Sequence, residues 1–227
     1  MRVLFLFSLC FFSGVSHAVS VSYGVGSAVD ENQPHQSANF EWELGVDPNI
    51  PVYNYQEDGL IISRIDGSTH GTSSGHMDAA SNSSHKGFQG FTGGFFYKGS
   101  ALEAVSISVA DGTDMLALEV MIGTGYPDSE TAGSWETYRD GVLTGSGYFT
   151  YVDVGTTIGF YDANGFDELL IGTGRGDQSG SFFATNRLGA TAIDNVRVAT
   201  AVPIPAAVWL FGSGLGLLGW FRRRKIA

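Results

Sequence analysis

The sequence predicts an all-β protein, an antiparallel β-sandwich, on three observations. Glycine supplies 32 of the 227 residues, and glycine is disfavoured inside helices but suits turns and bulges. Short stretches in which apolar and polar residues alternate follow one another, and Asp-Gly or Asn-Gly pairs separate several of them. No stretch between residues 19 and 200 has the apolar period of an amphipathic helix.

The expected strands follow in chain order. The clearest is 101–110, in which Val105, Ile107 and Val109 alternate with polar residues. After an Asp111-Gly112 turn, residues 115–123 are apolar almost throughout, as in a strand that is buried on both faces. Further strands are expected at 135–138, 142–143, 147–154, 156–161, 166–171, 180–185 and 191–200, with hairpin turns at Asp140-Gly141 and Asn164-Gly165.

The first part of the body is less regular. Residues 40–44 and 59–65 alternate as strands do, whereas 66–90 is rich in Ser, Gly, Thr and Asn and is expected to be a long irregular loop. Its three histidines are His70, His76 and His85. Their spacing fits no zinc pattern, so a solvated loop is preferred over a metal site. The aromatic run 88–97 is expected to pack in the core, with stacking on sugar rings as the alternative.

The charges are unevenly distributed along the chain. Twelve basic residues stand against 23 acidic ones, and five of the basic residues lie at the two ends: Arg2, Arg222, Arg223, Arg224 and Lys225. The remaining 7 basic residues face all 23 acidic ones, so the body carries a net charge of −16. This balance argues against a nucleic-acid partner, because phosphate binding needs clustered Lys and Arg. The single cysteine, Cys10, lies near the N-terminus, so the body can form no disulfide and no Cys-ligated zinc site.

Residues 1–18 are typical of a secretory signal peptide. Arg2 precedes an apolar run at 3–12, and small residues then lead to Ser16-His17-Ala18. This ending fits the small-x-small cleavage pattern and predicts a cut after Ala18. The apolar run is too short to span a bilayer comfortably.

The C-terminus, 201–227, has three parts. The first is Val202-Pro203-Ile204-Pro205-Ala206, whose two prolines prevent a strand or helix from continuing. Residues 204–221 carry no charge, and as a helix they would be about 27 Å long, enough to span a membrane. The basic cluster Arg222-Arg223-Arg224-Lys225 follows, and basic residues remain on the cytoplasmic side. The sequence therefore predicts an exported body from 19 to 200 and a cytoplasmic tail.

This arrangement of a Val-Pro-x-Pro-Ala motif, an apolar helix and an Arg/Lys cluster resembles the PEP-CTERM sorting signal. It is most similar to the VPLPA-CTERM variant, with Ile204 where that variant usually has leucine. The resemblance implies an exported protein of a Gram-negative bacterium that is anchored in the inner membrane as a precursor. It further implies processing near Pro203–Ala206 by an exosortase, a membrane transpeptidase-like enzyme, and delivery to the cell surface or extracellular matrix. Partner genes in such systems often direct extracellular polysaccharide synthesis.

Two short segments refine the expected fold. Residues 166–174, FDELLIGTG, resemble a late strand of concanavalin A-like jelly rolls. Residues 193–198, IDNVRV, resemble the closing strand of jelly-roll carbohydrate-binding and cell-surface modules. The resemblance implies a jelly-roll-like sandwich. The period of two places Asp167 and Asp194 on the faces of the aliphatic residues that follow them, so each carboxylate needs donors or a cation there, unless it accepts turn amides or reaches solvent.

Residues 162–168 are rich in oxygen ligands. Asp162, Asn164 and Asp167 could help to hold a structural Ca²⁺, which prefers carboxylate and carbonyl oxygens from turns. The alternative is a hairpin turn that needs no ion. No other cofactor is expected.

No enzymatic motif stands out: the sequence contains no H-E-x-x-H and no P-loop. The preferred hypothesis is a non-enzymatic exported β-sandwich that binds or decorates polysaccharide. Two alternatives stay open. One is a secreted glycan-active hydrolase with an unrecognised pair of carboxylates, and the other is a purely structural surface component.

Overall fold

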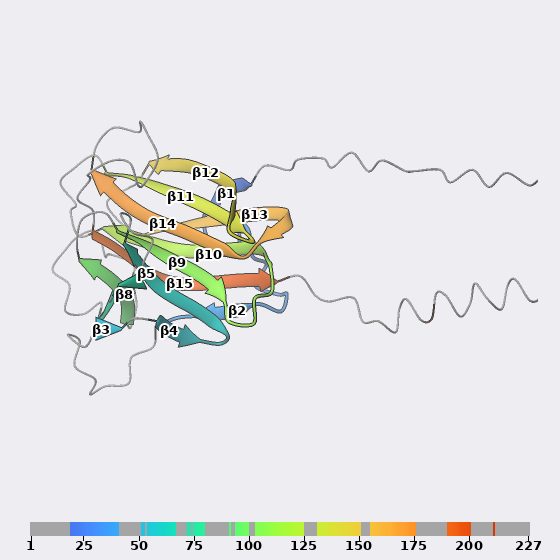
Figure 1. Ribbon diagram of the computed structural model, residues 1–227, viewed down its shortest axis with the longest axis horizontal. Coiled ribbons are helices and arrows are strands. Elements are labelled where there is room, and N and C mark those ends of the chain that lie inside the picture. The colour runs from blue at the N-terminus through green and yellow to red at the C-terminus, as the bar shows by residue number, and fades with distance from the viewer. Residues whose placement is uncertain are drawn as a thin grey trace, which may run out of the picture.

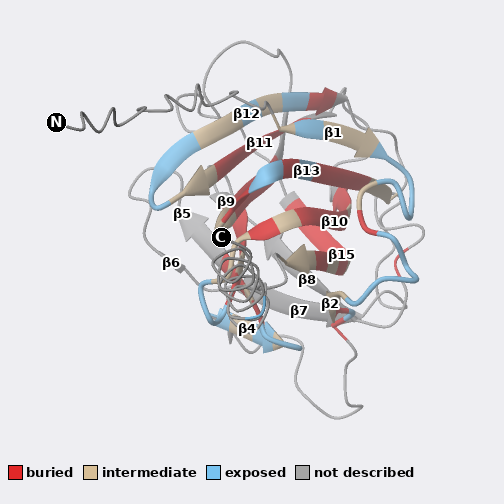
Figure 2. Ribbon diagram, turned by 90° about the vertical axis from the view of Figure 1, so that its right-hand side faces the viewer, coloured by how far each residue is buried: buried red, intermediate tan, exposed pale blue. Residues whose placement is uncertain are grey.

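The computed structural model describes the following residues: 19–40, 51–52, 54–66, 72–73, 75–79, 91, 94–99, 103–124, 131–150, 155–175, 190–200 and 211. These residues form two antiparallel sheets that pack face to face (Figures 1 and 2), so the predicted all-β, two-sheet antiparallel fold is confirmed. Within the same ranges, no helix has the length and apolar character needed to cross a membrane. The predicted signal peptide lies outside the described residues, and so does the predicted membrane span apart from Phe211.

The first sheet, called sheet A, has eight strands in the described part of the chain. Its order is β1 (Ser20–Tyr23), β13 (Thr156–Phe166), β10 (Met115–Thr124), β15 (Ala190–Thr200), β8 (Gly94–Gly99), β7 (Gly75–Ala79) and β3 (Pro51–Val52). The short strand β2 (Gln36–Ala38) pairs with the second half of β15, beside the half that pairs with β8.

The second sheet, sheet B, has seven strands among the described residues. Its order is β12 (Val142–Thr150), β11 (Thr131–Arg139), β14 (Glu168–Arg175), β9 (Glu103–Val109), β5 (Leu60–Asp66) and β4 (Asn54–Glu57), and β6 (Thr72–Ser73) pairs with β5. The sheet edges formed by β12 and β1 approach each other, because Val19 lies within 3 Å of the position that a Cβ on Gly145 would occupy.

From β8 onward the chain changes sheet at every connection except the one between β11 and β12. As a result, the order β8-β15-β10-β13 in sheet A faces the order β9-β14-β11-β12 in sheet B. Apart from β11 and β12, strands that are neighbours in these two orders are therefore not consecutive in the sequence.

The core lies between the two sheets and consists of the alternate residues of each strand. The predicted alternation of β9 is confirmed, since Val105, Ile107 and Val109 are all buried. Strand β10 is buried on both faces, as its apolar sequence predicts. The aliphatic residues that complete the core on the neighbouring strands are Leu60, Ile62, Leu118, Val120, Ile122, Ile158, Leu169, Ile171, Ile193, Val196 and Val198.

Two glycines make room for aromatic rings between β11 and β12. Gly133 lies opposite Phe149, and Gly147 lies opposite Trp135. A Cβ on Gly147 would be 2.8 Å from Cζ2 of Trp135, and a Cβ on Gly133 would overlap the Phe149 ring. Each ring therefore lies against the bare backbone of the opposite glycine, and both rings belong to the core.

The hairpin predicted at Asp140-Gly141 is confirmed. Arg139 pairs with Val142, so the loop has two residues. Both loop residues have positive φ, 51° at Asp140 and 72° at Gly141, as a type I′ turn requires.

The hairpin predicted at Asn164-Gly165 is wrong. Both residues belong to β13 in sheet A, whereas the next strand, β14, lies in sheet B. Opposite β10 the pairing jumps from Tyr161 to Phe166, so these residues form a large bulge in which Gly165 has a φ of 79°. Phe166, just after this bulge, still pairs with Met115 in sheet A, and the next strand, β14, pairs with β11 in sheet B. The chain therefore changes sheet directly after the Asn-Gly bulge.

Three other strand expectations change. The stretch 66–90 is not an irregular loop throughout, because it contains β6 and β7. Phe40 lies outside any strand, with a φ of 52°, while 41–44 and the predicted strand at 180–185 lie outside the described residues. Of the aromatic run, 94–97 are in β8 and the ring of Phe91 is buried, which agrees with core packing at that residue.

Replacing Gly133 by alanine should destabilise the protein. The new methyl group would collide with the Phe149 ring, which is buried in the core, so we expect a loss of about 1–3 kcal/mol in the free energy of unfolding. Denaturant unfolding measures this loss. Ser146→Ala, at an exposed position of the same hairpin, is the control and should change stability by less than about 0.5 kcal/mol. Equal stability of the two variants would contradict the packing described here.

Candidate functional site

The outer face of sheet B carries a group of polar side chains. In β11 the inward positions are Trp135 and Thr137, so Glu136 and Tyr138 point to the other side of the sheet. In the register with β14, Glu136 lies opposite Leu170 and Tyr138 lies opposite Glu168. The two glutamates therefore occupy diagonal positions on adjacent strands of the same face.

A row of mostly polar residues crosses this face at the level of Glu136. Going from β12 to β4, successive partners are Ser146, Glu136, Leu170, Ser106, Ser63 and Asn54. Glu136, Ser106 and Ser63 are each less than 10% exposed, at 7%, 5% and 7%. Buried polar groups of this kind require hydrogen-bond partners, which the row itself supplies in part.

Three short hydrogen bonds connect this group. The hydroxyl of Tyr138 donates to Oε2 of Glu136 at 2.6 Å. The hydroxyl of Ser106 donates to Oε1 of Glu168 at 2.5 Å, and that of Ser63 donates to Oδ1 of Asn54 at 2.7 Å. The pKa of Tyr138 is raised well above its usual value, first by burial and then by its hydrogen bond to Glu136 and the negative charges of Glu136 and Glu168. Tyr138 therefore stays protonated and acts as a donor.

An exposed aromatic ring occupies the position diagonal to Glu136 on the neighbouring strand. Tyr148 of β12 is opposite Ser134, on the same outer face, and is 44% exposed. Carboxylates accept hydrogen bonds from hydroxyl groups, and an exposed tyrosine ring offers a flat apolar surface. Sugars present hydroxyl groups at the edge of the ring and an apolar face, so this combination suits a glycan.

The sequence analysis missed Glu136 and Tyr138. It predicted the strand at 135–138 but did not consider which side chains would face outward, although Glu-x-Tyr has the period of two that would have shown it. Glu168 appeared there only as the last residue of the oxygen-rich segment 162–168. No local pattern could bring Glu168 next to Glu136, because β11 and β14 are separated by two intervening strands in the sequence.

The predicted calcium ligands have other contacts in the structure. Asp162 is buried, and its Oδ1 accepts the backbone N–H of Asn164 at 2.8 Å. Its Oδ2 lies 3.8 Å from the guanidinium of Arg139. The Asn164 side chain is exposed, and Oδ2 of Asp167 accepts the backbone N–H of Asp140 at 2.5 Å. For Asp167 the expectation of a bond to turn amides is therefore confirmed.

Other candidate ligands do not gather in the described part of the chain. In the ranges that the structure describes, no three His, Cys, Asp or Glu residues lie close enough to hold a metal ion. His76 lies in β7, while His70 and His85 lie outside those ranges. Calcium at 162–168 stays a prediction.

Asp194 is buried, as predicted, but it lies on the other face of its strand. Asn195 is an extra residue with a φ of 49°, and it forms a bulge between the residues that pair with β10. Asp194 therefore lies opposite Met121 on the outer face, whereas Val196 and Val198 are in the core. The prediction that all three share a face is wrong because a bulge interrupts the period of two. The carboxylate of Asp194 accepts the N–H of Asn195 at 2.8 Å.

A serine motif in the sequence has no catalytic setting. Residues 71–75 read G-x-S-x-G, the pattern of the nucleophile elbow, in which the serine sits on a sharp turn between a strand and a helix. Here Ser73 lies within β6, which pairs with β5 in sheet B. A serine inside a paired strand does not have the geometry that this motif requires.

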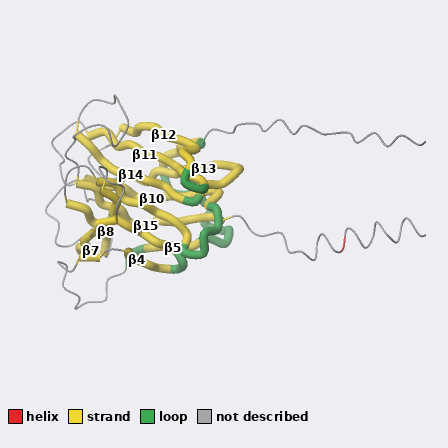
Figure 3. Tube along the Cα trace, in the orientation of Figure 1, coloured by secondary structure: helices red, strands yellow, loops and turns green. Residues whose placement is uncertain are grey.

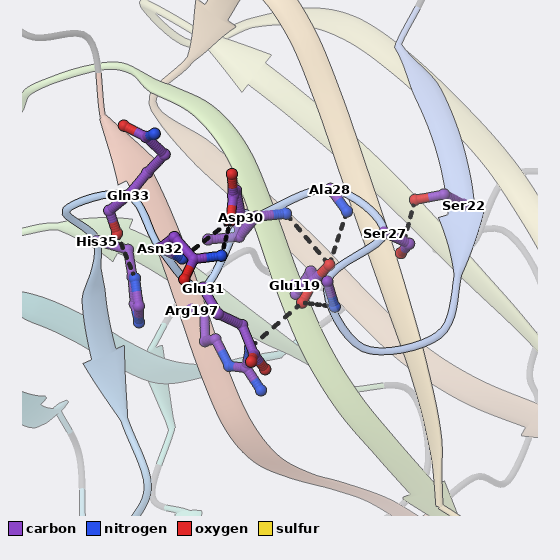
Figure 4. Close-up of polar contacts among 12 residues, drawn as sticks. Ser22, Ser27, Ala28, Asp30, Glu31, Asn32, Gln33, His35, Glu119 and Arg197 are labelled. Atoms are coloured by element: carbon purple, nitrogen blue, oxygen red, sulfur yellow. Dashed lines mark hydrogen bonds and ion pairs between the residues drawn. The ribbon is translucent and has the colours of Figure 1, made fainter.

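Another buried carboxylate, Glu119, lies on the outer face of sheet A (Figure 4). It is 1% exposed and accepts the backbone N–H groups of Gly26, Ala28 and Val29 at 3.1, 2.6 and 3.1 Å. Oε2 also lies 4.0 Å from the guanidinium of Arg197. Three amides and a nearby cation compensate the buried charge. Glu119 therefore anchors the loop that follows β1.

Two further acidic residues hold the next part of the same segment. Oε2 of Glu57 accepts the N–H groups of Asn39 and Phe40 at 3.1 and 3.0 Å. Asp58 accepts the N–H of Ser37 at 2.9 Å. Together with Glu119, these residues attach 19–40 to both sheets. Their role is structural, and the outer face of sheet B remains the better candidate for ligand binding.

Comparison with known proteins identifies no relative, since neither the family models nor the curated proteins contain a match to this chain.

Glu119→Gln should loosen the loop and destabilise the fold. A glutamine amide turns a donor group toward backbone donors, which leaves at least one of the three N–H groups without its acceptor, so we expect a loss of about 1–2 kcal/mol. Hydrogen exchange at Gly26, Ala28 and Val29 should become faster. The control is Glu31→Gln, which breaks the exposed ion pair to Arg197 and should cost less than about 1 kcal/mol. Unchanged exchange at the three amides would rule out the anchoring role.

If a calcium ion binds at 162–168, a chelator that removes the ion should lower the stability of the protein. If the ion binds, EDTA lowers the melting temperature of the protein and added Ca²⁺ restores it, because a ligand of the folded state alone stabilises that state. Asp162→Asn should abolish this response. A melting temperature that EDTA leaves unchanged would favour the alternative, a corner that is held by Arg139 and backbone amides alone.

Proposed function

We propose that this protein is an exported, non-enzymatic β-sandwich of the cell surface or extracellular matrix that binds polysaccharide. An exosortase-type enzyme would process it at Val202–Ala206, after anchoring in the inner membrane by the apolar helix and the basic tail. The proposal joins the sorting signal in the sequence to the site on sheet B.

The observation that carries the proposal is that the described strands begin just after the expected signal-peptide cut and end just before the expected processing motif. Val19 packs against the core, and β1 starts at Ser20, just after the expected cut at Ala18. At the other end, β15 stops at Thr200, two residues before the Val202–Ala206 motif. Both cuts would therefore leave every described strand intact. This is essential at the C-terminus, because β15 lies between β10 and β8 in the middle of sheet A.

The strand order supports the jelly-roll refinement of the fold. In a jelly roll, eight strands form two Greek keys, and successive strands are distributed over two four-stranded sheets. The facing orders β8-β15-β10-β13 and β9-β14-β11-β12 have that arrangement. Lectin domains are among the proteins that use this architecture, so a glycan-binding role suits the fold as well as the site. The fold alone does not decide function.

The outer face of sheet B supports polysaccharide as the ligand. It combines the exposed ring of Tyr148 on β12 with the Glu136 carboxylate and the Tyr138 hydroxyl on β11 and the Glu168 carboxylate on β14, which are three neighbouring strands. The net charge of −16 in the body favours a neutral or cationic glycan over an acidic one, since an acidic polymer would be repelled.

One observation favours a hydrolase as the second candidate. Glu136 and Glu168 occupy diagonal positions on adjacent antiparallel strands. The Cα atoms of such residues are about 7–8 Å apart, so their carboxyl groups can reach a similar separation. Inverting glycosidases hold their two carboxyl groups about 6.5–9.5 Å apart. Against this, both carboxylates already accept hydrogen bonds within the sheet: Glu136 accepts from the Tyr138 hydroxyl, and Glu168 accepts from the Ser106 hydroxyl.

A polysaccharide panel separates these functions. The protein should be retained on a neutral glycan without shortening it, and Tyr148→Ala should reduce retention by about tenfold through loss of ring stacking worth roughly 1–1.5 kcal/mol. Tyr161→Ala is the matched control, because Tyr161 is 48% exposed on the outer face of sheet A. Shortened chains that disappear with Glu136→Gln or Glu168→Gln would support the hydrolase. Neither retention nor cleavage would favour a purely structural role.

Replacing Pro203 and Pro205 by alanine tests the sorting signal. We expect the full-length precursor to accumulate in the inner membrane, because the two prolines keep the processing segment out of regular structure. Mass spectrometry of the surface-exposed form locates both cut ends in the parent protein. Release of the double variant at the normal rate would argue against Val202–Ala206 as the processing site.

A further inference from the structure

Both ends of the described sandwich lie at the same end of sheet A. The register places Ser20 opposite Tyr161, Tyr161 opposite Ala117, and Ala117 opposite Ala199. Ser20, the first residue of the sheet, and Ala199, the last but one, are thus in one transverse row, three strand spacings apart. At about 4.8 Å per spacing this is about 14 Å. We call this end, where β1 begins and β15 stops, the terminal end of the sandwich; β15 points toward it in Figure 1.

Only a short segment separates the terminal end from the predicted membrane span. Strand β15 stops at Thr200, and the span begins at Ile204, so three residues connect them. Fully extended, this connection reaches about 13 Å at most. A sandwich attached this closely cannot rotate freely above a bilayer, because the strands continue away from the attachment point.

The terminal end is acidic. Its described turns, which Figure 3 shows as the green loops, carry one or more aspartates each. Asp58 lies in the β4–β5 turn, Asp111 and Asp114 follow β9, Asp140 lies in the β11–β12 turn, and Asp167 lies between β13 and β14. These turns meet in space, since Ala110 N–H donates to Gly59 O and Asp167 N–H donates to Tyr138 O. Asp58, Asp111 and Asp140 are exposed.

We propose that this acidic terminal end is the surface that faces the lipid bilayer in the anchored precursor, and that the opposite end of the sandwich faces away from the membrane. The inference rests on the membrane span of the proposed function. Like-charge repulsion from anionic headgroups acts over a Debye length of about 8 Å at physiological salt, which is within reach of the short connection. The acidic turns therefore keep the sandwich off the headgroups and leave Val202–Ala206 accessible for processing.

In this orientation, the C-terminal ends of β10, β12 and β14 face away from the membrane. At the end far from the membrane, β10 stops at Thr124, β12 at Thr150 and β14 at Arg175. Tyr148 lies two residues from the end of β12 on that side, so the candidate glycan site is nearer to the outward end than to the bilayer.

Energy transfer from single fluorophores to the membrane tests the orientation. The full-length chain with Cys10→Ser is reconstituted into vesicles of phosphatidylcholine and phosphatidylglycerol that contain an acceptor lipid. One label is placed at Val142→Cys and the other at Tyr148→Cys, which are exposed positions at the two halves of β12 and about 20 Å apart along the strand. Transfer should be clearly more efficient from residue 142 than from residue 148. Equal or reversed efficiencies in an inserted protein would overturn the orientation.

A charge-neutral variant tests the repulsion separately. With the label at residue 142, Asp111→Asn combined with Asp140→Asn should raise transfer in phosphatidylglycerol vesicles at low salt and leave it unchanged in pure phosphatidylcholine. Asparagine keeps the turn at Asp140, because it tolerates the positive φ found there. No difference between the two lipids would overturn the repulsion. Extraction of the full-length chain from vesicles by alkaline carbonate would instead refute the membrane span itself, and the proposed function with it.

Discussion

The antiparallel pairing of β10 with β13 and β15 is the constraint on which the rest of this structure depends. The inner face of β10 supplies Leu118, Val120 and Ile122 to the core, and its outer face carries the buried Glu119. One neighbour, β15, is the last strand of the sandwich. The central part of sheet A therefore cannot form until the chain has been made as far as Thr200.

Acidic side chains act mainly as acceptors for the backbone in the described part of this protein. Glu119, Glu57, Asp58 and Asp167 each accept one or more main-chain N–H groups. These bonds attach the first 22 residues of the sandwich, 19–40, and the β11–β12 turn. Part of the acidic excess that suggested cation ligands in the sequence is therefore used within the fold. Glu136 and Glu168 on the outer face of sheet B differ, because they accept hydrogen bonds from the hydroxyl groups of Tyr138 and Ser106.

Local patterns predicted β5 and the strands from β9 to β15 well, but they missed β1, β2, β3, β4, β6 and β7. They predicted strand partners poorly. Alternation identified β9, and an uninterrupted apolar run identified β10, because side-chain burial follows directly from those periods. The two turn signals had opposite outcomes. Asp140-Gly141 closes a hairpin, whereas Asn164-Gly165 lies in a bulge that leads from sheet A to sheet B. An Asp-Gly or Asn-Gly pair predicts a turn. Whether that turn closes a hairpin depends on whether the strands before and after it pair with each other.

The sequence by itself determined most of the segments that form strands after residue 100, which residues face the core where no bulge intervenes, and which features of the two ends predict export. Only the tertiary structure decided that Glu136 and Glu168 share a face, that Asp194 leaves the core side at Asn195, and that Ser20 and Thr200 lie at one end. The physical reason is the range of the interactions. Strand formation depends on a period of two within one segment, whereas neighbours in a sheet are chosen by long-range pairing and by the burial of two complete faces.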